Sequence, residues 1–324
     1  MSIGRYLLRR ALVALLLVFV VSSGALLLTR LAPGDSATDA GLASDPAQRA
    51  RLRGELGLDR PLGAQYLDWL AGALRFDLGW SVVFSRPVAD LLSERALNTA
   101  VLASVALVGA TAVGVPLGLY TGAHASGFVP GLVRTLSVVI LSVPPLLGSL
   151  FLMLFAARTG WLPVGGMTSS VPADSGWMTW AIDLARHIPL PALALALPLA
   201  ATLEQLQSQA IRESLREPFV RAAQARGLTF SQALRHHAWR VSLAPVLGLY
   251  GLMIGSLFSG SFAVEVVTGW PGLGRLMFDA LRARDLYLVT GCAAAGACFI
   301  ALGTLAADVM LVAADPRRRM GDLR

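Results

Sequence analysis

Long apolar blocks alternate with polar segments along the whole chain. A helix needs about 20 apolar residues to cross a bilayer, and each block is close to that length. The blocks cover residues 11–31, 97–120, 135–157, 189–206, 241–264 and 286–312. This pattern predicts an all-α polytopic membrane protein with about six transmembrane helices.

Proline in the third predicted span and small residues in the second and fifth are expected to affect how these helices bend and pack. The third span carries Pro144 and Pro145 at its centre, where proline removes a backbone hydrogen bond and is expected to kink the helix. Small residues recur at four-residue spacing in the second and fifth spans, at Gly114, Gly118, Gly122, Gly251, Gly255 and Ser259. Because this spacing lets helix backbones approach closely, these faces are expected to pack against neighbouring helices.

The segment at 33–95 is polar, is rich in turn residues and carries more Asp and Glu than Arg. Pro61 marks a predicted helix start or turn, and residues 65–76 space their apolar side chains as in an amphipathic helix. We expect a small extracytoplasmic subdomain here. It would lie between the N-terminal tail and first transmembrane helix at 1–32 and a transmembrane core at 96–324.

The composition supports a membrane protein. Apolar residues make up 55% of the chain and charged residues 15%, whereas soluble domains average about 45–50% and about 25%. All 27 basic residues are arginine. The chain therefore has no lysine for a phosphate-binding P-loop or for a Schiff base. If ATP drives this protein, another chain must hydrolyse it.

The net charge is +7, and the arginines lie mostly beside the apolar spans. The positive-inside rule explains this distribution, so we do not expect nucleic-acid binding. The rule places both termini and the loop at 213–240 in the cytoplasm. The first apolar run is longer than the about 7–15 residues of a signal-peptide core and lacks a clear cleavage site. It is expected to remain as the first transmembrane helix.

The loop at 213–240 is an arginine-rich segment between the fourth and fifth spans. A helix is predicted at 220–226 and is ended by Gly227, a residue that tolerates a left-handed backbone. A second short helix is predicted at 231–239, before the next span begins. Two short helices with a glycine bend suit docking onto another protein. From the spacing alone, a solvated connector explains the same charges equally well.

No catalytic or metal site is predicted. His236 and His237 are adjacent, so on a helix they point in different directions and form a poor metal-binding pair. Cys292 and Cys298 match no metal-site spacing and are expected to be small buried packing residues. Asp308 lies in the last span, where a carboxylate is a functional candidate, but we favour a structural role near the inner end.

Two other classes of function are weighed against the residues. An intramembrane enzyme would need a catalytic pair at membrane depth, such as Ser with His or two Asp, and no convincing pair is present in the sequence. An ion-coupled secondary transporter would need charged residues at the midplane and usually an internal repeat. Neither feature stands out, and this class is kept as the alternative.

Short motifs occur in a characteristic order along nearly the whole chain. They lie at residues 6–10, 31–35, 56–62, 65–66, 69–70, 77–79, 86–88, 160–163, 190–192, 269–275, 284–285 and 315–317. Together they resemble the inner-membrane permease subunits of the peptide/nickel family of ABC importers. Their number and order make the resemblance specific. It implies a type I ABC importer permease fold and a multi-pass location in the bacterial inner membrane.

In this family the loop at 213–240 resembles the EAA coupling motif, which seats in a groove of a partner ATPase. The residues implied in coupling are Glu217, Arg221, Ala222, Ala223, Arg226, Gly227, Leu228 and Pro245. Ala222, Ala223 and Gly227 match the small positions of the motif. Pro245 matches its closing proline at the start of the next span. Arg221 stands where the general pattern has glutamate, so a salt bridge from that glutamate is not expected.

The resemblance further implies an ATP-driven importer of di- or oligopeptides, with this chain forming half of the pathway. A nickel or metal-chelate importer, or a glutathione-type importer, is the alternative. The implied partners are a second permease subunit, two ATP-binding subunits and an extracytoplasmic substrate-binding protein. No cofactor is expected in this chain, because the ATP-binding subunits use ATP and Mg²⁺. We expect an outer gate or binding-protein contact at Gly269, Trp270, Pro271, Gly272, Leu273, Gly274 and Arg275.

Overall fold

The computed structural model describes residues 3–32, 54, 59–124, 126–169 and 176–314. Within these ranges the chain is mostly helical and contains one two-stranded hairpin. Among the described residues, five helices are long and apolar enough to cross a membrane, and a sharply bent pair makes a sixth if it forms one span. The predicted all-α polytopic architecture is confirmed.

The chain divides into two compact units. The first comprises Val101–Trp270 and the chain from Leu302, and the second comprises Ser2–Ala100 and Pro271–Ala301. Two helices, α5 (Val88–Ala123) and α14 (Leu286–Ala314), contribute residues to both units. The subdomain expected at 33–95 stays a prediction, because most of its first half lies outside the described residues.

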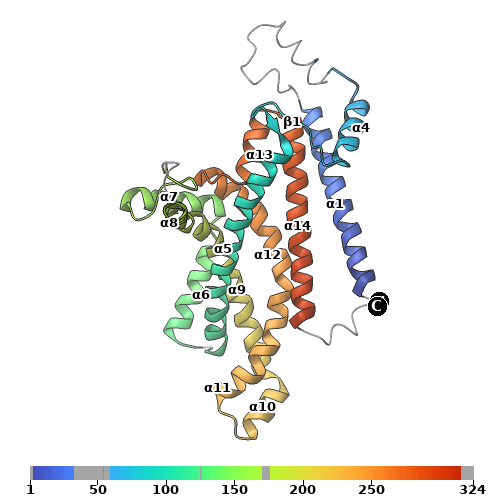
Figure 1. Ribbon diagram of the computed structural model, residues 1–324. Helices are drawn as coiled ribbons and strands as arrows, with labels where there is room; N and C mark the ends of the chain where they lie inside the picture. The colour runs from blue at the N-terminus through green and yellow to red at the C-terminus, as the bar shows by residue number, and fades with distance from the viewer. Residues whose placement is uncertain (1–2, 33–53, 55–58, 125, 170–175, 315–324) are drawn as a thin grey trace. The chain divides into compact units, whose positions relative to one another are not determined.

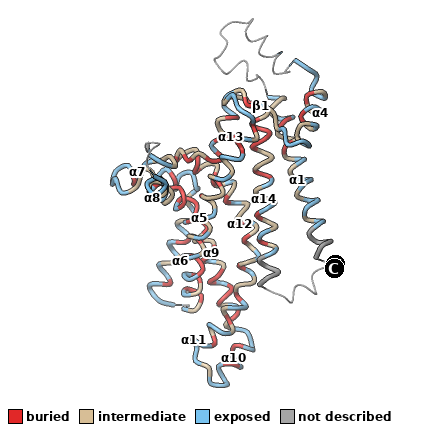
Figure 2. The backbone as a smooth tube through the Cα atoms, viewed as in Figure 1, coloured by how far each residue is buried: buried red, intermediate tan, exposed pale blue. Residues whose placement is uncertain are grey.

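In the second unit, the N-terminal helix packs through one end of its length. Leu26 of α1 (Ile3–Leu31), Trp69 of α4 (Leu62–Ala73) and Leu286 of α14 form a buried apolar cluster. Most of the apolar surface of α1 remains exposed (Figure 2). A helix that is apolar on all sides suits contact with lipid or with another chain. The predicted first span is confirmed.

A short antiparallel hairpin pairs β1 (Trp80–Ser81) with β2 (Arg86–Pro87). Asp285 is fully buried. One of its carboxylate oxygens accepts hydrogen bonds from Ser81 Oγ at 2.7 Å and from the backbone N–H of Val82 at 2.8 Å. The other oxygen accepts from the backbone N–H of Leu288 at 3.2 Å. A single side chain therefore holds the hairpin and caps the start of α14. Neither the hairpin nor this cap was predicted from the sequence.

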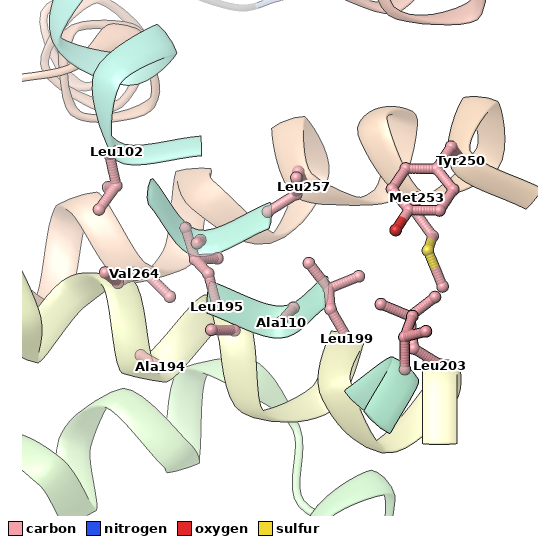
Figure 3. Close-up of a cluster of buried hydrophobic side chains, with 14 of the residues drawn as sticks. Leu102, Ala110, Ala194, Leu195, Leu199, Leu203, Tyr250, Met253, Leu257 and Val264 are labelled. Atoms are coloured by element: carbon pink, nitrogen blue, oxygen red, sulfur yellow. The ribbon is translucent and has the colours of Figure 1, made fainter. Parts of the chain in front are cut away.

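In the first unit, α9 (Pro189–Arg216) and α12 (Trp239–Thr268) run side by side (Figure 1). Buried apolar side chains of α5, α9 and α12 fill this contact, among them Leu102, Leu195 and Met253 (Figure 3). Inside a bilayer, such a contact is stabilised by van der Waals packing and not by removal of apolar surface from water. This cluster is the main core of the unit.

The glycines of α5 let its backbone meet α9 closely. A Cβ added to Gly118 would lie 2.6 Å from the carbonyl oxygen of Glu204, and one added to Gly122 would lie 2.7 Å from that of Ser208. Real Cβ atoms do not approach other atoms so closely, so no side chain fits at either position. The close approach predicted for the second span is confirmed.

Two expectations about small residues need correction. A Cβ added to Gly251 would lie 3.3 Å from that of Ala307, but one added to Gly255 would meet no described atom within 4 Å. The predicted packing face of the fifth span is therefore confirmed only at Gly251. Cys292 is buried, whereas Cys298 is exposed. Successive residues of a helix are rotated by about 100° about its axis, so two cysteines six positions apart lie on different faces.

The third predicted span is broken and not merely kinked. Two helices, α6 (Phe128–Leu141) and α7 (Pro145–Thr159), meet at an angle of 105°. Pro145 opens α7, where its missing N–H leaves no helical hydrogen bond unmade. Pro144 before it disfavours the helical conformation for Val143. Consecutive prolines therefore end one helix and begin the next.

Several helices reach beyond the apolar blocks that predicted them. α5 begins at Val88 and α9 continues to Arg216, because polar residues with good helix propensity extend each helix. Two further amphipathic helices, α8 (Trp177–His187) and α13 (Leu273–Arg282), were not predicted. Turn residues precede both of them. Apolar length alone thus underestimates the helical part of this chain.

Candidate coupling site

The predicted coupling element, residues 213–240, starts in the last turn of α9 and continues into a short helix. This helix, α10 (Pro218–Ala225), lies with α11 (Phe230–Ala233) at one end of the first unit (Figure 1). Glu217 precedes it in an extended conformation, and Pro218 occupies its first turn. Proline is well suited to this position because its φ is already helical. The first predicted helix of the element is confirmed.

Gly227 ends α10 in a left-handed conformation with a φ of +98°. Its N–H donates to the carbonyl oxygen of Gln224 at 2.9 Å, and the N–H of Leu228 donates to that of Ala223 at 3.3 Å. These two bonds form a Schellman motif, which satisfies carbonyl groups at the helix end. A Cβ on Gly227 would meet no atom within 4 Å. The requirement for glycine is therefore conformational and not steric.

The second predicted helix is not separate from the fifth span. Thr229 caps α11 through a capping box, accepting from the N–H of Gln232 at 3.3 Å while its own N–H donates to the Gln232 side chain at 3.0 Å. α11 passes through a π-helical turn, η1 (Leu234–Ala238), directly into α12. No glycine or proline lies between the predicted helix and the span, so nothing ends the helix there. Phe230–Thr268 is one continuous helical segment.

The coupling element has a small core of its own. Val220 of α10, Ala233 of α11 and Ala238 of η1 are fully buried and pack together. Ala223 is also buried, whereas Ala222 is exposed. The two alanines therefore differ in role. Ala223 lets α10 pack within the element, and Ala222 leaves the outer face of α10 without a bulky side chain.

The outer face of the element is basic and partly aromatic. Its exposed candidate residues are Glu217, Arg221, Ala222, Arg226 and Gly227. Phe219 and Phe230 beside them remain 41% and 44% exposed. Arginine and aromatic side chains are enriched at protein–protein interfaces. Pro245 was expected at the start of the fifth span but lies inside α12, because that helix begins earlier than its apolar block.

Two buried hydrogen bonds join α5 to α9 and α9 to α12. Thr121 Oγ1 donates to Glu204 Oε1 at 2.5 Å, and Gln207 Nε2 donates to Ser242 Oγ at 2.8 Å. All four side chains are at most 1% exposed. α9 and α12 are also the helices that lead into the coupling element. Glu204 and Gln207 were not predicted as site residues, although two polar residues three apart at the end of the fourth apolar block mark one shared face of a helix.

The predicted outer segment is mostly buried. Gly269 ends α12 with a φ of +69°, and Trp270 is fully buried in the core of the first unit. Within the second unit, the N–H of Leu273 donates to Thr99 Oγ1 at 2.8 Å as α13 begins. Of the seven predicted residues, Arg275 alone is exposed. The whole segment was expected to be a turn. Instead, the turn ends at Gly272, and Leu273 begins α13.

Comparison with known proteins identifies the family. A family described as the binding-protein-dependent transport system inner membrane component matches residues 114–320. The chain belongs to this family. The N-terminal region of such membrane components matches residues 3–102. The permease is therefore a multi-pass transport subunit of the bacterial inner membrane and not an enzyme.

Relatives from several bacteria match the permease along its whole length. A Sinorhizobium fredii protein described as a peptide ABC transporter permease is 33% identical over 98% of this chain and 99% of its own. A Brucella suis protein described as a peptide permease is 33% identical over 97% of this chain and 98% of its own. The oligopeptide transport system permease protein of Bacillus subtilis is 29% identical over 96% and 98%.

The coupling element exposes arginine and phenylalanine side chains. Within the described ranges, no group of three or more His, Cys, Asp or Glu side chains is placed to hold a metal ion. The arginines can form ion pairs, and Phe219 and Phe230 can insert into apolar pockets of a partner. The Schellman motif and the internal core hold α10 in a fixed orientation.

Proposed function

We propose that this permease is a subunit of an ATP-driven importer of di- or oligopeptides and forms half of its translocation pathway. The observation that carries the proposal is the similarity over 98% of the chain to a relative described as a peptide ABC transporter permease. Matches of similar coverage to relatives described by peptide or oligopeptide transport support the same cargo.

The complete importer contains a second permease subunit, two ATP-binding subunits and an extracytoplasmic substrate-binding protein. The family description, which names binding-protein-dependent transport, supports the binding protein. ATP and Mg²⁺ act in the ATP-binding subunits, since this chain has no lysine for a P-loop. The permease itself uses no cofactor.

The coupling element docks on an ATP-binding subunit in the cytoplasm. Arg221 and Arg226 meet acidic side chains of the partner, and Phe219 and Phe230 anchor in apolar pockets. Because α10 is stiffened by its cap and its core, movement of the ATPase is passed to α9 and α12 instead of being absorbed by a flexible loop. These helices then open and close the pathway in alternation.

The segment from Gly269 to Arg275 serves at the extracytoplasmic end of α12 as an outer gate or binding-protein contact. Its exposed Arg275 makes the contact with the binding protein. Buried Trp270 and Leu273 fix the helix ends on either side of the turn. Movement at the contact thereby reaches α12 and α13.

Reconstitution tests this function. The permease is placed in liposomes with its second permease and ATP-binding subunits, and uptake of a labelled peptide from the binding protein is measured. We expect uptake that requires ATP and stops when the ATP-binding subunits are omitted. Uptake driven by an ion gradient in the permease alone would indicate a secondary transporter. Uptake of a nickel chelate but no peptide would contradict the proposed cargo.

A further inference from the structure

A partly open cavity of about 190 Å³ lies between α7, α9 and α12 in the first unit. Residues that line it include Pro145, Ala194, Pro198, Thr202, Ser256 and Gly260. Its lining is mostly apolar, and none of the lining side chains is charged. A complete small-molecule pocket measures about 300–1,000 Å³. The cavity is therefore large enough for one part of a ligand and too small for a whole one.

The two polar side chains of the cavity, Thr202 and Ser256, each bond a carbonyl group of their own helix. Thr202 Oγ1 donates its hydrogen to the carbonyl oxygen of Pro198 at 2.9 Å, and Ser256 Oγ donates to that of Met253 at 2.8 Å. Each hydroxyl oxygen thus keeps lone pairs for a ligand. Pro198 has no N–H to donate to the carbonyl of Ala194 one helical turn earlier. Ala194 and Pro198 both line the cavity.

The cavity also adjoins interrupted helices. Pro145 follows the 105° bend between α6 and α7, and Pro198 lies inside α9. At membrane depth, irregular backbone is tolerated only where it is buried in protein or lines a water-filled space. Interruptions in two helices that meet at one cavity are expected where a membrane protein admits a polar ligand.

We propose that this cavity is a subsite of the transport pathway that receives the backbone N–H groups or the terminal ammonium group of a passing peptide. The inference rests on the proposed import of peptides. In this arrangement the two hydroxyl oxygens can accept hydrogen bonds from N–H donors, whereas binding a carboxylate would require each hydroxyl to give up its bond within the helix. The apolar remainder accommodates side chains without hydrogen-bonding to them. The subsite therefore recognises what all peptides share.

The test uses the complete transporter in proteoliposomes, with labelled trialanine supplied by the binding protein. We expect Thr202→Val combined with Ser256→Ala to lower trialanine uptake by at least about fivefold, because each lost hydrogen bond costs about 1 kcal/mol. Thr135→Val combined with Ser261→Ala is the matched control. Those hydroxyls make the same intrahelical bonds but do not line the cavity. The control should transport like the wild type.

A photoreactive trialanine that carries a diazirine gives a second measurement, which does not depend on the folding of any variant. Cross-links to residues 194–202 of α9 and 256–260 of α12 support the subsite. Cross-links confined to other helices, or equal uptake by the double variant and its control, contradict it. A wild-type transporter that hydrolyses ATP but imports no trialanine contradicts the proposed function itself.

Discussion

Thr121 of α5 and Glu204 of α9 share a buried hydrogen bond of 2.5 Å. The other carboxylate oxygen of Glu204 has no hydrogen-bond partner within the described chain. A buried carboxyl group is costly unless it is hydrogen-bonded. The bond to Thr121 therefore helps to hold α5 against α9, beside the glycine that lets the two backbones meet.

Replacing Glu204 should destabilise the permease. Glu204→Ala leaves the buried Thr121 hydroxyl without this partner and opens a small space, which should lower the free energy of unfolding by about 1–3 kcal/mol. Glu204→Gln keeps an acceptor in place and should lie closer to the wild type. Thermal unfolding of the purified permease measures both variants, and Gln205→Ala, at an exposed neighbour, is the control. An unchanged midpoint for Glu204→Ala would show that the bond contributes little.

Replacing two different glycines of α5 with alanine should have different effects on the free energy of unfolding. Gly118→Ala would place a Cβ 2.6 Å from the Glu204 carbonyl oxygen, and relieving that clash should cost about 1–3 kcal/mol. A Cβ on Gly109 would meet no atom within 4 Å, so Gly109→Ala should be neutral or stabilise the helix by up to about 1 kcal/mol. The unfolding midpoints of Gly118→Ala and Gly109→Ala are measured together with that of the wild type. Equal effects would contradict the close approach of α5 and α9.

Gly227→Val should uncouple ATP hydrolysis from uptake. A β-branched residue at a φ of +98° strains the end of α10, at a cost of about 1–2 kcal/mol, and should disturb the orientation of the coupling element. We expect ATP hydrolysis to continue while peptide imported per ATP falls at least about fivefold, a loss of the size that such a strain can produce. The ratio of peptide imported to ATP hydrolysed is measured in proteoliposomes.

Gly160→Val is the control for that variant. Gly160 ends α7 with a φ of +68°, and a Cβ there would meet no atom within 4 Å. The substitution therefore adds a similar backbone strain outside the coupling element. If both variants lose the same share of uptake, or if neither loses any, coupling does not depend on Gly227.

The apolar blocks predicted the transmembrane helices well, because each block corresponds to a surface that must avoid water. Gly227 likewise predicted where α10 ends, since glycine at a helix end has one main conformational use. Hydrophobicity could not show that Pro144 and Pro145 break a helix by 105°. A single internal proline kinks a helix, and only the neighbouring packing decides how far two of them bend it.

Other features depend on residues far apart in the chain. Asp285 holds Ser81 across about 200 positions, and Glu204 meets Thr121 across more than 80. Neither partner carries a local signal for the other. The π-helical turn before α12 is similar, because its residues also form an ordinary α-helix by propensity. The structure was needed to place these pairs and turns.

Cross-linking from Ala222 shows whether the coupling element docks on an ATP-binding subunit. Ala222→Cys is made in a Cys298→Ala background, which removes the exposed native thiol, and is labelled with a benzophenone maleimide in the assembled transporter. We predict a photo-cross-link to the ATP-binding subunit. Leu74→Cys, at a site 78% exposed in the second unit, should give no such link. A labelled Ala222→Cys that links to the ATP-binding subunit no more often than Leu74→Cys would contradict docking through the coupling element.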